Sequence, residues 1–142
     1  MKQVVIYTDG ACKGNPGPGG WGAIIICNGI ETELCDGEAD TTNNRMELMS
    51  AIRALEELKE NCIVELHSDS RYLVDGITKW VKGWIKKKWM TSANTPVKNK
   101  ELWIRLLAAS SRHEVSWNWV AGHSGHEYNE RVDGLARSKC QK

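Results

Sequence analysis

Long apolar runs are absent from this sequence of 142 residues. No window approaches the run of about 18 apolar residues that a membrane-spanning helix needs, so we expect no helical membrane span. The N-terminal stretch MKQVVIYTDG reaches an aspartate too early to contain the apolar region of a signal peptide. Low-complexity tracts are missing as well. These absences together predict a globular protein of the cytoplasm.

Metal-binding and disulfide patterns are also missing from the cysteines. The sequence has no CxxC motif, and its five cysteines are an odd number with scattered spacing. This pattern suggests neither a zinc site nor a disulfide framework. We interpret these residues as reduced thiols, at Cys12, Cys27, Cys35, Cys62 and Cys140.

The sequence has almost no net charge, +1 overall, but its charges are unevenly distributed. Residues 1–60 hold five Lys or Arg against ten Asp or Glu, whereas residues 71–105 hold nine against two. The segment TKWVKGWIKKKWM, residues 78–90, contains five lysines and three tryptophans and no acid. One concentrated basic segment in a near-neutral chain predicts a local contact with a polyanion.

The pattern of apolar residues predicts one α/β domain over residues 1–142. Apolar runs and alternation indicate five strands, over residues 3–8, 21–27, 31–39, 62–68 and 114–120. Helical spacing indicates four helices, over residues 43–60, 70–80, 99–110 and 126–140. The order is βββαβααβα, and Asn28-Gly29 is a strong hairpin signal between the second and third strands. Early hairpins followed by helical crossovers predict a mixed sheet covered by helices.

Two of the predicted helices begin at residues suited to N-caps. Asn44 is a good N-cap for the first helix, and Glu47 three residues later completes the pattern of a capping box. Asn99 takes the same place before the third helix.

Four acids lie at strand ends or toward the inner faces of helices. Asp9 and Asp69 follow strands whose ends are a usual place for ligands in α/β sheets. Glu47 and Asp133 lie beside the apolar stripes of their helices. Each acid alone has a structural explanation, as a turn residue, a capping partner or a partly exposed helix acid. Should all four converge, their repulsion would call for a divalent cation, and an oxygen-rich site suits Mg²⁺.

Four longer strings carry a family resemblance: YTDGACKGNPGPGGWGA, TTNNRMELMSAI, LHSDSRYLVDGI and WVAGHSGHEYNERVDGLA. Together they closely resemble the bacterial type 1 ribonucleases H (ribonuclease HI), in the order and spacing of that family. The resemblance implies the ribonuclease H fold, a five-stranded mixed sheet with helices on both faces. It also implies an endonuclease, acting as a monomer, that hydrolyses the RNA strand of RNA/DNA hybrids and leaves 5′-phosphate and 3′-hydroxyl ends.

The resemblance implies a role for each acid. Asp9, Glu47, Asp69 and Asp133 match the four metal-binding carboxylates of the family, and His123 matches its loop histidine. Two Mg²⁺ ions roughly 4 Å apart, with Mn²⁺ as a possible substitute, would activate water and stabilise the leaving oxygen. Asp9 would bridge both ions. An imidazole near physiological pH can transfer protons, which suits His123.

Substrate contacts follow from the glycine-rich turn and the basic segment. Glycines let the backbone approach the 2′-hydroxyl that distinguishes RNA from DNA. Lysines bind phosphates without reading sequence, and indole rings pack against sugars or bases. Two further positions match family residues that hold a phosphate of the DNA strand. The candidates are Gly10, Cys12, Asn15 and Asn43 at the turn, Thr42 and Asn99 at the DNA phosphate, Arg71 after SDS, and Trp80, Trp84, Lys86, Lys87 and Lys88 in the basic segment.

Two departures from the family and three alternatives stay open in the sequence. Asp40 stands where many relatives have an arginine, and Arg71 where a glutamine is common. The alternatives are a non-catalytic hybrid-binding module, a DNA-processing nuclease of the same fold, and a small-molecule phosphatase. Whether a single-strand-binding protein docks on this chain is not encoded in any motif.

Overall fold

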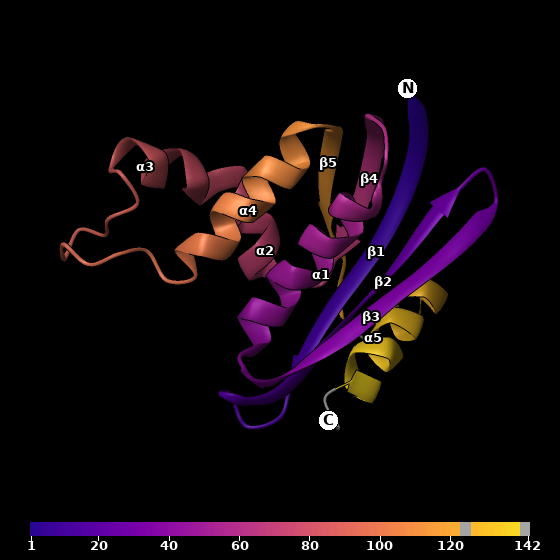
Figure 1. The fold of residues 1–142 in the computed structure, drawn as a ribbon, viewed down its shortest axis with the longest axis horizontal. Coiled ribbons are helices and arrows are strands. Elements are labelled where there is room, and N and C mark those ends of the chain that lie inside the picture. Colours follow the sequence, from indigo (N-terminus) through magenta and orange to yellow (C-terminus); the bar gives the residue numbers. More distant parts are fainter. Residues whose placement is uncertain (123–125, 140–142) are drawn as a thin grey trace.

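The computed structural model describes residues 1–122 and 126–139 (Figure 1). Its strands are β1 (Lys2–Cys12), β2 (Gly17–Cys27), β3 (Ile30–Thr41), β4 (Cys62–Ser68) and β5 (Glu114–Trp119). Its α-helices are α1 (Asn43–Glu57), α2 (Arg71–Asp75), α3 (Val81–Lys86), α4 (Lys100–Ser111) and α5 (Glu127–Lys139). A π-helical turn, η1 (Gly76–Trp80), joins α2 to α3. If these three segments count as one helix, the predicted element order is confirmed.

The five strands form one mixed sheet in the order β3-β2-β1-β4-β5. β2 pairs antiparallel with β1 and β3, whereas β4 pairs parallel with β1 and β5. The hairpin between β2 and β3 turns at Asn28 (φ 53°) and Gly29 (φ 78°), and two left-handed residues are what a type I′ turn requires. The predicted mixed sheet and the hairpin predicted at Asn28-Gly29 are therefore confirmed.

Helices cover both faces of the sheet, and two glycines let them come close (Figure 1). A Cβ added at Gly10 would lie 2.5 Å from the backbone nitrogen of Glu47 in α1. A Cβ added at Gly22 would lie 2.6 Å from Cβ of Leu135 in α5. Gly22 is paired with Asp9, the neighbour of Gly10, so the two glycines face opposite sides of the sheet. The predicted two-sided covering is confirmed.

The larger core lies between the sheet and the helices on the α1 side. Leu48, Ile52 and Leu55 of α1 are fully buried, as their helical spacing predicts. Trp103 of α4 and Leu66 of β4 are also fully buried in the same cluster. Among residues 1–122 and 126–139, no helix is both long and apolar enough to cross a membrane.

The first strand is longer than predicted, which changes the place of Asp9. β1 pairs with β4 only as far as Thr8, but it continues beside β2 as far as Cys12. Asp9 therefore does not end the strand. It is the first residue beyond the parallel pairing, where β1 and β4 separate.

The predicted cap of α1 at Asn44 is wrong. Thr42 is the N-cap, with φ −130°, and its hydroxyl accepts a hydrogen bond from the Arg45 backbone nitrogen at 3.2 Å. Asn44 lies inside the helix. Because the capping box requires Glu47 three residues after the cap, that explanation of Glu47 is also wrong.

Asn99 precedes α4 as predicted, but its side chain does not cap the helix. It adopts a left-handed conformation (φ 60°) and makes no capping hydrogen bond. Its side-chain oxygen instead accepts from Arg45, and its nitrogen donates to the Tyr72 hydroxyl at 3.1 Å. Asn99 therefore joins α1, α2 and α4.

We expect Gly22→Ala to lower the free energy of unfolding by about 1–3 kcal/mol, because the added methyl group overpacks the contact with α5. Gly83→Ala is the matched control, since a Cβ at this helical glycine meets nothing within 4 Å. There the change should raise the free energy of unfolding by up to ~1 kcal/mol. Urea denaturation measures both values. A Gly22→Ala protein as stable as the parent would contradict the close packing of α5.

Candidate active site

Three carboxylates meet where β1 and β4 separate. Asp9, Glu47 and Asp69 each offer an oxygen, and these oxygens all lie within 4.8 Å of one another. They come from β1, from α1 and from the residue that follows β4. Segments far apart in the sequence thus place their acids at one point.

The fold explains why these acids converge. Thr8 and Ser68 are the last pair in the parallel register, so the next residues, Asp9 in β1 and Asp69 after β4, lie close together where the two strands separate. Glu47 reaches them because α1 packs directly on Gly10, which has no side chain to hold the helix away. The backbone nitrogen of Gly10 also donates to Asp9 Oδ1 at 2.9 Å.

Asp133 of α5 faces the same hollow. A cavity of about 560 Å³ is lined by Asp133 together with Asp9, Glu47 and Asp69. A smaller hollow of about 30 Å³ joins Asp133 to Asp69 again. Asp133 also forms an ion pair with Arg137 one helical turn later, with Nε and Oδ2 3.1 Å apart. All four predicted acids therefore border one cavity.

Burial makes this cluster electrostatically costly. It raises the pKa of Asp9 to about 8, with the charges of Asp69 and Asp133 adding to the effect, while the Gly10 N–H opposes it. Burial also raises the pKa of Glu47 well above its ordinary value, and the charges of Asp9 and Asp69 raise it further. Glu47 Oε1 is buried without a hydrogen-bond partner in the described part of the chain. A buried carboxylate oxygen left unpaired beside two other acids is the environment that a divalent cation satisfies.

The wall of the cavity includes three residues predicted at the glycine-rich turn, which the structure places at the end of β1 and the start of α1. Gly10, Cys12 and Asn43 line it beside the acids. Asn15 does not line it, but its Oδ1 accepts a hydrogen bond from the Asn43 backbone nitrogen at 2.8 Å. The turn is thus tied to the first residue of α1.

The predicted phosphate pair, Thr42 and Asn99, meets through a third residue. Thr42 caps α1 and accepts from the Arg45 backbone, while Arg45 Nη1 donates to Asn99 Oδ1 at 3.1 Å. Arg45 also forms an ion pair with Glu101 at 2.6 Å. Sequence reasoning missed Arg45, a cation beside these two residues.

The predicted basic segment lies on α3 and its flanks, apart from β1 and α5 (Figure 1). Trp84 packs against Trp80, Trp89 and Trp103, with ring centroids 5.3–6.0 Å apart, and joins the core. Trp80 is more exposed, at 40%. The lysines after it are all exposed, at Lys86, Lys87 and Lys88. The segment therefore presents exposed lysines on a cluster of packed tryptophans.

Two remaining candidates have different outcomes. Arg71 begins α2, two residues after Asp69, and its guanidinium lies over the ring of Trp119. His123 lies outside the described residues.

Sequence reasoning also missed two features around the acids. Arg137 follows Asp133 by four residues, a spacing that could have indicated their ion pair. Tyr7 stacks on His67 and Tyr128 with centroids 4.8 Å apart in each case, linking β1, β4 and α5. No local pattern signals that stack, because its rings come from distant segments.

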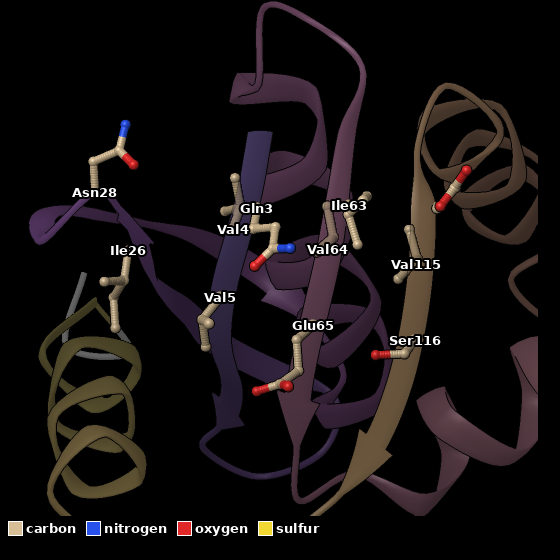
Figure 2. A pocket seen from close by; sticks show the side chains of 11 residues that line it. Gln3, Val4, Val5, Ile26, Asn28, Ile63, Val64, Glu65, Val115 and Ser116 are labelled. Carbon is tan, nitrogen blue, oxygen red and sulfur yellow. The ribbon is translucent and has the colours of Figure 1, made fainter. Parts of the chain in front are cut away.

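A larger groove, of about 720 Å³, lies over β1, β4 and β5 (Figure 2). Its lining mixes apolar side chains such as Val5 and Ile63 with polar ones such as Gln3 and Ser116. The Glu65 carboxylate there already pairs with His67 at 2.8 Å. In the described part of the chain, a set of three metal-ligating side chains is found at Asp9 and its partners and not in this groove. The acid cavity is therefore the better candidate for chemistry.

Comparison with known proteins agrees with this assignment. A family model described as RNase H matches residues 1–141. The chain belongs to the RNase H family. Among RNases H, it is 65% identical to the ribonuclease H of Phenylobacterium zucineum, over 95% of this chain and 88% of that protein. It is 60% identical to the ribonuclease HI of Caulobacter vibrioides, over 94% of this chain and 90% of that protein.

Solved RNases H share the fold. LC9-RNase H1, described as a type 1 RNase H with the type 2 active-site motif, matches with a TM-score of 0.89 at 34% identity, over 99% of this chain and 73% of that chain. LC11-RNase H1, solved in complex with an RNA/DNA hybrid, matches with a TM-score of 0.73 at 26% identity, over 97% of this chain and 96% of that chain. The family resemblance and the fold predicted from the sequence are therefore confirmed.

The raised pKa of Asp9 predicts how the stability of this RNase H depends on pH. Between 3.8, the ordinary value, and about 8, the folded protein holds a proton that the unfolded chain releases. Stability therefore falls as pH rises through this window. We expect the melting temperature in a chelator to fall from pH 4 to pH 8, and Mg²⁺ to reduce the fall because it binds the folded state.

Asp9→Asn should flatten that pH profile, because the variant has no proton to lose at this position. Asp36→Asn is the matched control, since Asp36 is an exposed acid of β3. Melting curves in chelator at several pH values measure the effect. An unchanged slope in Asp9→Asn would contradict the assigned cause.

Proposed function

We propose that this chain is an endonuclease that hydrolyses the RNA strand of RNA/DNA hybrids, with two Mg²⁺ ions at its four acids. The observation that carries the proposal is the convergence of Asp9, Glu47 and Asp69 within 4.8 Å, with Asp133 on the same cavity. The names of the relatives, ribonuclease H and ribonuclease HI, support the same activity. The products would carry 5′-phosphate and 3′-hydroxyl ends.

The four acids would share the two cations unequally. When bound, the ions would make water more acidic and stabilise the leaving 3′ oxygen. Asp9 is suited to touch both ions, because the charges of Asp69 and Asp133 both act on it. Glu47 and Asp69 would complete one site and Asp133 the other. Mn²⁺ offers the same oxygen coordination and could replace Mg²⁺.

The chain's own residues would prepare this site before substrate arrives. The Gly10 N–H orients the Asp9 carboxylate, and the ion pair with Arg137 orients Asp133. Burial excludes water from Glu47, so its carboxylate would act on a bound cation in a low-dielectric environment. His123 keeps the proton-transfer role that the resemblance gave it.

Hybrid selectivity would come from two contacts on different strands. The backbone at Gly10 and Cys12 lines the cavity, where it can approach a ribose 2′-hydroxyl, and Asn15 and Asn43 support that wall. Thr42 and Asn99 would hold a phosphate of the DNA strand. LC11-RNase H1 was solved with an RNA/DNA hybrid, which supports the same substrate for this chain.

The remaining cations would hold the duplex beyond the active site. Lys86, Lys87 and Lys88 are exposed and can bind phosphates of the duplex, with Trp80 packing against sugars. Asp40 stands where many relatives carry an arginine. Arg45 donates to Asn99 at that pocket, but it is also paired with Glu101, so it would hold Asn99 in place for the phosphate rather than replace the missing charge.

We also propose that the chain acts as a monomer with one catalytic domain, in the cytoplasm. Cys27, Cys35 and Cys62 are free thiols, which suits a reducing compartment.

The test of this proposal compares four substrates with and without Mg²⁺. They are an RNA/DNA hybrid, duplex RNA, duplex DNA and a DNA duplex with one ribonucleotide. We expect strong, metal-dependent cutting of the hybrid alone. Cutting of duplex DNA would favour a DNA-processing nuclease, and binding without cutting would favour a hybrid-binding module.

We expect Asp9→Asn to abolish cleavage, with a loss of at least about 10³-fold in kcat, because it removes a charge that the cations require. The variant should still fold and bind the hybrid. Asp36→Asn should cleave like the parent. Gel assays of cleavage and titrations of a labelled hybrid measure the two properties. Normal cleavage by Asp9→Asn would refute the metal assignment.

A further inference from the structure

An arginine stacked on a tryptophan lies next to the acid cluster. Arg71 is two residues after Asp69, and its guanidinium carbon lies 3.9 Å from the centre of the Trp119 ring. The Trp119 indole nitrogen donates to the backbone oxygen of Asp69 at 3.1 Å. The tryptophan is thus fixed to an acid of the site, and the arginine is fixed to the tryptophan.

The register of the sheet sets the position of this pair. Trp119 is paired with Ser68 at the end of β4, and the backbone of Val120 donates to the Ser68 oxygen at 2.9 Å. The ring therefore stands at the same strand end as Asp69. Its exposed fraction of 41% is large for a tryptophan, and Arg71 is exposed as well. Stacking keeps a guanidinium in one plane at little cost in solvation.

Arg71 has no ion pair and no hydrogen bond among the residues that the structure describes, in contrast to most arginines of this chain. Four arginines pair with carboxylates, and Arg112 donates to a backbone oxygen. Those four are Arg45, Arg105, Arg131 and Arg137. Although Asp69 is two residues away, no ion pair within 4.0 Å joins it to Arg71. The stacking holds the guanidinium beside the acids but apart from them.

We propose that Arg71, supported by Trp119, binds a backbone phosphate of the hybrid next to the phosphate that is cut. The proposal rests on the function proposed above and specifies which group of the substrate Arg71, a candidate from the sequence, would contact. A guanidinium offers a planar fork of donors and no acceptor, which matches two oxygens of a phosphate. Because Arg71 is not neutralised by the acids, its positive charge remains for the substrate.

The first test measures the salt dependence of cleavage. We expect Arg71→Gln to lower kcat/KM about 5–20-fold at low salt, and to reduce the slope of log kcat/KM against log salt by about 0.7–0.9, the effect of one lost phosphate contact. Arg71→Lys should keep the slope, because it keeps the charge, and recover kcat/KM in part. The matched control is Arg53→Gln, since Arg53 also lies over a tryptophan ring, that of Trp21 at 5.4 Å, but lines neither acid cavity. It should match the parent in both readouts.

The second test locates the phosphate with neutral methylphosphonates. Each linkage near the cut, in the RNA strand or in the DNA strand, is replaced in turn while the cleaved linkage stays natural. At one position the parent should lose about as much kcat/KM as Arg71→Gln does, and Arg71→Gln should lose nothing further there. The strand that holds this position identifies the source of the phosphate.

Three results would overturn the proposal. One is an unchanged salt slope in Arg71→Gln, and another is the absence of coupling at every methylphosphonate. The third is coupling of Arg71 to a single 2′-deoxy replacement in place of a phosphate, which would mean a sugar contact. Parent activity on the unmodified hybrid is measured in the same series, so a failure here is distinguishable from a failure of the proposed nuclease activity.

Discussion

Repulsion among buried carboxylates is the constraint on which the rest of this structure depends. Asp9 and Glu47 are both nearly inaccessible to water, and each has its pKa raised by burial first and by its acidic neighbours second. A protein selected for stability alone would separate such groups or pair them with cations. Here the neighbouring Arg71 is stacked away from them. The site is therefore costly to fold without ions and suited to bind them, which is the usual relation between function and local strain.

The packing of the fold serves this convergence at one strand. β1 lies in the centre of the sheet. On one face α1 packs on Gly10 of β1, and on the other face α5 packs on Gly22 of the neighbouring strand β2. The first approach delivers Glu47, and the second brings the helix that carries Asp133. Both glycines are required by contact distance, because a Cβ at either would collide with a helix. These two strand glycines thus act through packing at the site, and Gly10 also through access for substrate.

Local signals explain what the sequence could predict. The Asn28-Gly29 turn, the buried stripe of α1 and the order of strands and helices along the chain depend on local sequence, and all are confirmed. The cap of α1 was wrong because Thr42 and Asn44 are both good caps by residue type. Tertiary contact decides between them: Asn15 from the first turn binds the Asn43 backbone nitrogen and fixes where the helix begins. The pair of Arg71 and Trp119 depends on the register of β4 with β5, which no local pattern encodes.

Two arginines near the acids show how the chain divides its positive charge. Arg137 pairs with Asp133 directly, so it reduces repulsion in the metal-free protein but gives up its charge to the cluster. Arg71 pairs with no acid in the described structure, because Trp119 holds its guanidinium flat. A cation placed on the acids would compete with the divalent ions, whereas one held at their edge can meet a phosphate that the acids alone would repel. An acidic site attracts a polyanion only if positive side chains near it are not paired with its acids, as Arg71 is not. The basic segment on α3 supplies more such side chains at a distance.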